Sequence, residues 1–320
     1  MSFLEILYLL IPSAMIYATP LIFAGIGGVF SERSGVVNIG LEGIMIMGAF
    51  VAIYINLTYF EDFGRNVIWL SLLAALVVGA IFSILLAVAA VSFRADQTVT
   101  GVALNMLGVA VAVFSVKMIY DGKGQTDNIL APIQRFDIPF LSDIPIIGPM
   151  FFSDVYAVTI IAFAVAILAW FVIYKTPFGL RLRAVGEHPM AADTMGINVA
   201  RTRYTAVIIS GALGGVGGAV VAMTFALNFS SATIAGQGFM AIAAMIFGKW
   251  HPLGTLGAAL FFGLAQTLAI LGRQIPLIQE VPQVYLQILP YVLTILALAG
   301  FIGKAVAPKA SGQPYIKGKR

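Results

Sequence analysis

The sequence predicts an all-α protein built as a bundle of transmembrane helices. Sixty per cent of its 320 residues are hydrophobic, only 10% are charged, and the mean hydropathy is +1.00. A soluble domain carries roughly a quarter charged residues and needs polar side chains to cover its core. The composition therefore excludes an ordinary soluble enzyme and a disordered protein. The chain has no cysteine, which excludes disulfides, thiolate metal sites and a cysteine nucleophile.

Long apolar runs, bounded by charged residues or by Pro and Gly, predict about nine membrane spans, within a range of about eight to ten. They would form one transmembrane domain over residues 1–303. The run at 234–248 is short for a bilayer, which favours a broken or re-entrant helix. The predicted spans are 9–30, 36–57, 66–92, 98–120, 154–174, 204–226, 234–248, 252–272 and 284–302.

The basic residues predict which loops face the cytoplasm, because cytoplasmic loops carry an excess of Lys and Arg. Thirteen of the 18 Lys and Arg residues lie in one set of alternating loops and ends. This set includes the loop 175–203 and the tail 304–320, so we expect both, and the C-terminus, inside the cell. The loop 121–153 contains four prolines and is expected outside and mostly non-helical. The basic tail is typical of a contact with membrane lipid, and it lacks the surroundings of a nucleic-acid-binding module.

Polar side chains within apolar spans are costly and usually face other helices or a polar path. Asn38 and Glu42 lie four residues apart and therefore share one helix face. Glu42 would either pair with Arg33 or Arg94 and fasten two helices, or act directly in the path or gate. Asp96 begins a second polar cluster as a natural helix cap. We assign Asn38, Glu42 and Asp96 a structural or gating role.

Uncharged polar and aromatic residues are candidates for the substrate path. Asn105 lies further along the predicted helix that Asp96 caps, and it would either bond to a neighbouring helix or line the path. A third polar cluster, at 228–233 and 236–239, lies at the expected outer side. The sequence is compatible there with a solvated loop and with a polar vestibule for a solute. Such a set suits a neutral solute with hydroxyl groups and an aromatic base. The path candidates are Gln97, Thr98, Asn105, Asn228, Phe229, Ser230, Ser231 and Gln237.

Two further patterns concern the organisation of the helices. The spacing Ala95-x-Gln97 recurs as Ala235-x-Gln237, with further matches at a constant offset of 140, which favours inverted repeat halves. Between residues 211 and 218, five glycines at small-xxx-small spacing predict close helix approach. No P-loop pattern occurs, so we do not expect this chain to bind ATP by that motif.

The loop 175–203 is expected to hold a short helix. Pro189 suits the first turn of a helix, with Glu187 or His188 just before it. Gly196 is a typical residue beyond a helix end. An amphipathic helix on a cytoplasmic loop would either dock a soluble partner or lie on the lipid surface.

Three segments resemble the permease subunits of bacterial ABC importers, in the family of simple-sugar, nucleoside and branched-chain amino acid permeases. Ala191-Ala192-x3-Gly196, with its flank from Arg183 to Ile197, resembles the coupling loop of these permeases. The segments 34–43 and 247–254 resemble two other signatures of the family. Their form is most similar to that of nucleoside (guanosine-type) uptake permeases.

This resemblance implies a permease that forms the translocation path for a nucleoside, or a related simple sugar, in the bacterial plasma membrane. It implies three protein partners: a second permease that is a related but different chain, a cytoplasmic ABC ATPase, and an extracellular substrate-binding protein. The ATPase would hold ATP and Mg²⁺, whereas this chain would bind no cofactor or metal and would not be an enzyme. The implied ATPase-coupling residues are Arg183, Gly186, Glu187, His188, Pro189, Ala191, Ala192 and Gly196.

An ion- or proton-coupled secondary transporter of a small polar solute is the alternative. Glu42 and Asp96 would then carry protons, but such a transporter explains the long loop 175–203 poorly. A membrane-embedded enzyme would need a nucleophile or a metal set at depth. The sequence offers none, and the two histidines, His188 and His251, lie in separate loops.

Overall fold

The computed structural model describes residues 3–275, a few positions between 281 and 292, and 306–317. This part of the chain is mostly helical, which confirms the all-α class. Two short strands, β1 (Arg135–Phe136) and β2 (Val155–Tyr156), pair antiparallel. The helices are α1 (Phe3–Arg33), α2 (Leu41–Phe63), α3 (Val67–Ala87), α4 (Gln97–Ile119), α5 (Ile147–Phe151), α6 (Ala157–Lys175), α7 (Pro177–Glu187), α8 (Pro189–Thr194), α9 (Val199–Val221), α10 (Gln237–Phe247) and α11 (Pro252–Leu271).

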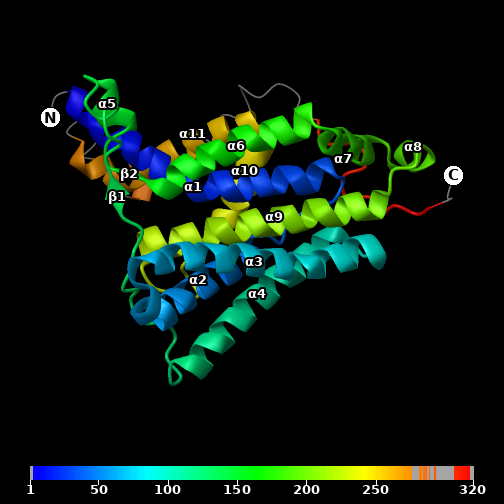
Figure 1. Cartoon of the computed structure of the whole chain (residues 1–320), viewed down its shortest axis with the longest axis horizontal. Helices are drawn as coiled ribbons and strands as arrows, with labels where there is room; N and C mark the ends of the chain where they lie inside the picture. The colour runs from blue at the N-terminus through cyan, green and yellow to red at the C-terminus, as the bar shows by residue number, and fades with distance from the viewer. Residues whose placement is uncertain are drawn as a thin grey trace.

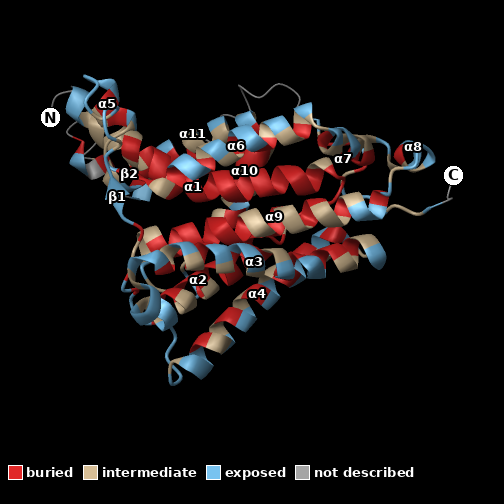
Figure 2. Ribbon diagram, viewed as in Figure 1, coloured by how far each residue is buried: buried red, intermediate tan, exposed pale blue. Residues whose placement is uncertain are grey.

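The long helices lie side by side, and the two ends of the molecule differ (Figure 1). The N-terminus, α5 and the two strands lie at one end. The helices α7 and α8 and the C-terminal segment 306–317 lie at the opposite end. Buried residues concentrate on α1, on the first half of α2 and on α9, which form the centre of the molecule (Figure 2).

Within the described residues, six helical segments are long and apolar enough to cross a membrane, and one of them, Leu41–Ser92, contains both α2 and α3. The chain is therefore of the multi-pass type. The count of about nine spans stays a prediction, because most of the ninth, 284–302, lies outside the described residues. α10 has 11 residues, or ~16 Å at ~1.5 Å per residue. This is short of the ~30 Å hydrocarbon core and agrees with the short helix expected at 234–248.

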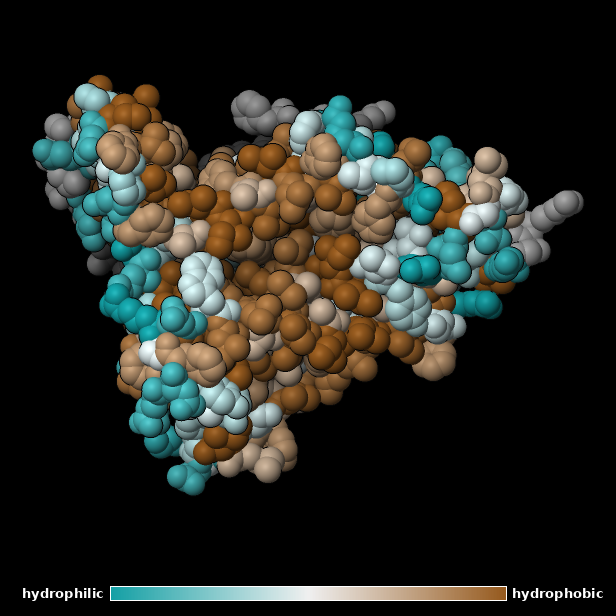
Figure 3. All heavy atoms as spheres, in the orientation of Figure 1, coloured by the Kyte–Doolittle hydropathy of each residue, from teal (hydrophilic) through white to brown (hydrophobic). Residues whose placement is uncertain are grey.

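Large apolar side chains are exposed along the middle of the molecule, between two more polar ends (Figure 3). A soluble monomer rarely exposes so broad an apolar surface. The surface suits contact with lipid or with a second membrane chain. It includes Trp69, Leu73 and Ile81 of α3, Met106 and Met118 of α4, and Ile167 and Leu168 of α6.

Glycines allow α2, α3 and α9 to pack closely, as the small-xxx-small spacing predicts. An added Cβ at Gly215 of α9 would overlap the carbonyl oxygen of Ala75 in α3. One at Gly218 would overlap the carbonyl oxygen of Met45 in α2. The backbone of α9 therefore touches the backbones of both α2 and α3.

Candidate functional site

A buried, non-helical connection joins α1 to α2 over residues 34–40. Most of its residues are buried, with Val37 and Ile39 half-buried, so its backbone groups need partners within the protein. The Val37 N–H donates to Oε1 of Gln97 at 2.7 Å. The Ile39 carbonyl accepts a hydrogen bond from Nδ2 of Asn105 at 3.0 Å. Two side chains of α4 therefore hold the connection in place.

Asn105 also fixes the first turn of α2. Its Oδ1 accepts a hydrogen bond from the Gly43 N–H at 2.7 Å. The two helices touch at this point, since an added Cβ at Gly43 would lie 2.7 Å from the Cα of Asn105. Asn105 thus bonds to a neighbouring helix, which was one of its two expected roles, while a role in lining the path stays a prediction.

The remaining polar residues at the start of α4 differ in their surroundings. Asp96 caps the helix, as expected, by accepting a hydrogen bond from the Val99 N–H at 2.9 Å. Gln97 is buried, whereas its neighbour Thr98 is exposed. Only one of the two adjacent path candidates is therefore accessible from outside this chain.

Glu42 joins α2 to α10. Its carboxylate accepts hydrogen bonds from the N–H groups of Gly236 and Gly238, each at 2.6 Å. These N–H groups belong to the start of α10, where a negative charge is stabilised by unpaired donors and by the helix dipole. The expected pairing of Glu42 with Arg33 or Arg94 is wrong for the described residues. Glu42 does fasten two helices, but with backbone groups as partners.

Four buried amide atoms lack a hydrogen-bond partner within the described part of the chain. Three belong to candidate residues, namely Oδ1 of Asn38, Nε2 of Gln97 and Oε1 of Gln237, and the fourth is Oε1 of Gln266. The other end of the Asn38 side chain donates to the Ser210 hydroxyl of α9 at 2.9 Å. Because an unpaired buried polar atom costs ~1–3 kcal/mol, these atoms are candidates for contact with water or with a polar solute.

The third polar cluster packs against the loop 121–153. Phe229 is 1% exposed, and its ring lies edge-on to that of Phe50, with 5.5 Å between the ring centroids. Ser230 forms an isolated antiparallel bridge with Gln125. The side-chain amide of Asn228 donates to Oδ1 of Asn128 at 3.3 Å. These candidates are thus part of an ordered turn, whereas Ser231 is exposed.

The expected helix of the loop 175–203 is present as α8. Pro189 occupies its first turn, with His188 as the N-cap residue. The helix ends at Thr194, and Gly196 follows with a left-handed φ of 81°. This part of the sequence prediction is confirmed, because proline and glycine fix the two ends through local backbone geometry.

α7 was not predicted, although the sequence contains a signal for it. The hydroxyl of Thr176 accepts a hydrogen bond from the Gly179 N–H at 3.3 Å, and Pro177 occupies the first turn. A capping threonine followed by proline is typical of a helix start. Of the implied coupling residues, Arg183, Gly186 and Glu187 lie on this helix.

Two implied coupling residues are structural within this chain. An added Cβ at Gly186 would overlap the Arg33 carbonyl oxygen, so α7 packs directly on the end of α1. Ala192 is 4% exposed and forms a small buried cluster with Val185 and Val199, which we call the α8 base. The exposed residues are His188, Ala191 and Gly196, while Arg183, Glu187 and Pro189 are half-buried.

Residues 249–251 connect the same end of α1 to α10 and α11. The Trp250 indole N–H donates to the Glu32 carboxylate, and Nε of Arg33 donates to the Trp250 carbonyl at 2.8 Å. Lys249 and Trp250 both adopt positive φ. Burial and the positive charge of Arg33 lower the pKa of His251, which favours the neutral imidazole. No local pattern predicts the pairing of Glu32 with Trp250, because it spans more than 200 residues.

Apolar spans, a polar break between α1 and α2, and an exposed helical loop at one end together define a polytopic membrane protein with the architecture of a transport permease. Among the described residues, no group of three His, Asp or Glu side chains is placed to hold a metal ion. Residues 10–298 match the family of branched-chain amino acid transport system permease components, and the chain belongs to this family. The suspected family resemblance is confirmed.

Two relatives match the whole chain. The chain is 60% identical over 320 residues to the guanosine ABC transporter permease protein NupQ of Bacillus subtilis, with 100% of both chains covered. It is 52% identical to the nucleoside ABC transporter permease protein NupC of Lactococcus lactis, again over 100% of both chains. A more distant match, at 26% identity, is the guanosine ABC transporter permease protein NupP of Bacillus subtilis, which covers 78% of this chain and 69% of that one.

The bonds of Asn105 predict a stability effect of its replacement. Asn105→Leu removes the partners of the Gly43 N–H and the Ile39 carbonyl, and each unpaired group should cost about 1–3 kcal/mol of the free energy of unfolding. Thr98→Val on the exposed side of the same helix is the control and should change stability by less than ~0.5 kcal/mol. Unfolding of the purified variants in detergent measures both, and equal stability would contradict this assignment.

The bonds of Glu42 predict a local effect at α10. Glu42→Gln leaves one acceptor oxygen for two N–H groups, because the amide nitrogen is a donor. We expect faster hydrogen–deuterium exchange at residues 236–238, by about tenfold or more, since a lost hydrogen bond of ~1.5 kcal/mol or more corresponds to that factor. Glu61→Gln, on the exposed end of the same helix, should leave this exchange unchanged. Unaltered exchange in Glu42→Gln would refute the role of Glu42.

Proposed function

We propose that this chain is a membrane-spanning subunit of an ATP-driven ABC importer and forms the translocation path for a nucleoside. The proposal is supported by its family and by the two full-length relatives at 60% and 52% identity, which are a guanosine and a nucleoside permease. The protein would lie in the plasma membrane of a bacterium. Its C-terminus and the loop 175–203 would face the cytoplasm, and the loop 121–153 would face outside.

The exposed helix α8 is the observation that carries the coupling role. On the outer side of α8, Met190 is 46% exposed and Ala191 is exposed. On the inner side of α8, Ala192 packs within the α8 base. One face is therefore rigidly attached to α7 and α9, and the other is free for a partner. A cytoplasmic ATPase would dock on this free face, bind ATP with Mg²⁺ and hydrolyse the ATP. The permease itself would bind no cofactor and catalyse no reaction.

Two further partners complete the proposed importer. Bacillus subtilis has two different guanosine permease chains, and this chain is 60% identical to one and 26% identical to the other. This difference favours pairing with a second permease that is related but not identical. An extracellular substrate-binding protein would deliver the nucleoside at the end opposite α8. The path candidates with unpaired amide atoms, Gln97 and Gln237, would meet the polar groups of the nucleoside.

The alternative of a proton-coupled secondary transporter has less support. It requires carboxylates that can gain and lose protons during transport. Glu42 instead holds two N–H groups of α10, and Asp96 caps α4. The ionised form of each carboxylate therefore accepts hydrogen bonds from backbone N–H groups that need an acceptor.

The proposal predicts that a charge on the free face of α8 uncouples the importer. Met190→Glu should reduce co-purification of the ATPase by at least about tenfold and abolish nucleoside uptake, because an unpaired charge buried in an interface costs several kcal/mol. Phe140→Glu is the control, since Phe140 is 89% exposed and lies outside the loop 175–203. ATPase pull-down and uptake of radiolabelled guanosine measure the effect. Normal uptake and normal ATPase binding by Met190→Glu would overturn the proposal.

A further inference from the structure

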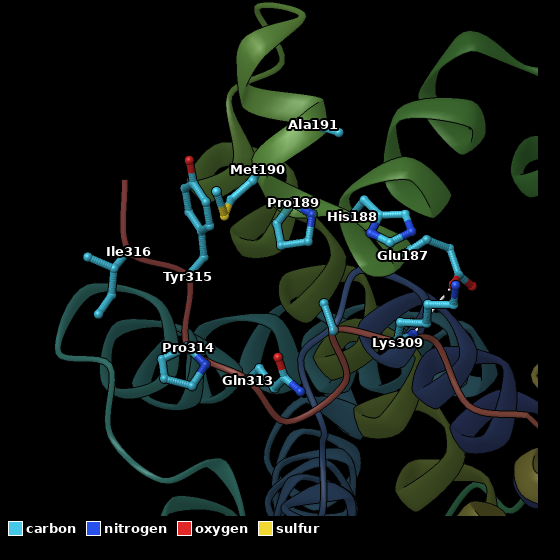
Figure 4. Close-up of a pocket in the computed structure, with 11 residues that line it drawn as sticks. Glu187, His188, Pro189, Met190, Ala191, Lys309, Gln313, Pro314, Tyr315 and Ile316 are labelled. Carbon is cyan, nitrogen blue, oxygen red and sulfur yellow. Dashed lines mark hydrogen bonds between the residues drawn. The ribbon is translucent and has the colours of Figure 1, made fainter. Parts of the chain in front are cut away.

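The C-terminal segment 306–317 is fastened to the end of the molecule that carries α8 (Figure 4). The Ala310 N–H donates to the Gly186 carbonyl at 2.9 Å, and the Gly312 N–H donates to the Gly35 carbonyl at 3.2 Å. The segment therefore bridges α7 and the connection between α1 and α2. It was expected at the lipid surface, but its described part packs on protein.

Two side chains strengthen this attachment. Arg203 of α9 is 1% exposed and donates from its guanidinium to the Gln313 carbonyl at 3.0 Å. A buried cation is costly unless it is bonded, so this carbonyl is a structural partner of Arg203. Tyr315 packs against the α8 base. The segment thus reaches the underside of α8 and is part of the same folded unit.

A groove of about 700 Å³ lies between α8 and the C-terminal segment. Pro189 and Met190 line it from α8, and Tyr315 and Ile316 line it from the C-terminal segment, as Figure 4 shows. Its lining is mixed, because the polar residues Glu187 and His188 on one side and Lys309 and Gln313 on the other lie beside these side chains. We call it the α8–tail groove.

We propose that the ABC ATPase docks on a composite surface made of α8 and the C-terminal segment, with a side chain of the ATPase seated in the α8–tail groove. This inference rests on the proposed function. The groove is continuous with the free face of α8, because Pro189, Met190 and Ala191 belong to α8 and also line the groove. An ATPase seated on the free face of α8 therefore covers the mouth of the groove.

The composite surface has a mechanical consequence. The C-terminal segment is bonded both to Gly186 beneath α8 and to Gly35 in the connection 34–40. A partner that binds and displaces this segment therefore displaces the connection 34–40 through the bond to Gly35, and not only through α7 and α8. The segment is then a second point at which the ATPase can bias the permease between its states.

The absence of natural cysteines allows a test with single-cysteine variants of the full chain in the complete transporter. Ile316→Cys probes the tail side of the groove, and Met190→Cys probes the α8 side. Val306→Cys is the matched control, since Val306 is 72% exposed on the same segment and does not line the groove. The rate of maleimide labelling is measured in lipid nanodiscs, with and without the ATPase bound to the permease pair.

We expect the ATPase to slow labelling of both Ile316→Cys and Met190→Cys by about tenfold or more, as for atoms buried in a stable interface, and to leave Val306→Cys unchanged.

Protection of Met190→Cys without protection of Ile316→Cys would overturn the composite surface and leave the proposed function standing. Protection of neither would overturn both. Slow labelling of Ile316→Cys in nanodiscs without ATPase would assign the groove to lipid instead. Gln313→Cys, which lines the same groove, replaces Ile316→Cys if that variant does not fold.

Discussion

The buried connection 34–40 imposes the main constraint on this structure, because a backbone without helical hydrogen bonds must find its partners elsewhere in the protein. The end of α1 supplies some of them, since the N–H groups of residues 34–36 donate to the carbonyls of Ser31 and Glu32, and segments distant in sequence supply others. Gln97 and Asn105 of α4 bond to Val37 and Ile39, and the C-terminal segment bonds to Gly35. The polar residues of α4, which are costly in an apolar span, are explained first by this structural need.

The same connection lies between the two regions that the proposed transport cycle must link. On one side, Gly186 of α7 packs on the backbone of Arg33, and Arg33 bonds to the turn before α11. On the other side, Glu42 holds the start of α10. A displacement of α8 would therefore reach α1, α2 and α10 through direct contacts. ATP-driven docking can switch the permease only through contacts that differ between its states, and these contacts are the candidates.

Local features of this fold can be predicted from the sequence, whereas its long-range pairings cannot. Apolar runs place the long helices, and Pro189 and Gly196 bracket α8, because both signals act through neighbouring residues. From the sequence, Glu42 is expected to pair with a basic side chain. Its partners are instead the N–H groups of glycines nearly 200 residues away. No charge pattern reveals such partners. The basic tail likewise suggests lipid, but its described part is attached through two backbone N–H groups, which leave no mark in a sequence, and through Arg203 and Tyr315, which lie far apart in the chain.

The orientation of α8 is the most direct test of the central claim that this end of the molecule receives a cytoplasmic ATPase. Ala191→Cys in the otherwise cysteine-free chain can be exposed to a membrane-impermeant maleimide, in intact cells and in inside-out vesicles, both from a strain that lacks the ATPase. Phe140→Cys serves as the marker of the opposite side. We expect labelling of Ala191→Cys in inside-out vesicles alone and of Phe140→Cys in intact cells. Labelling of Ala191→Cys in intact cells would contradict it.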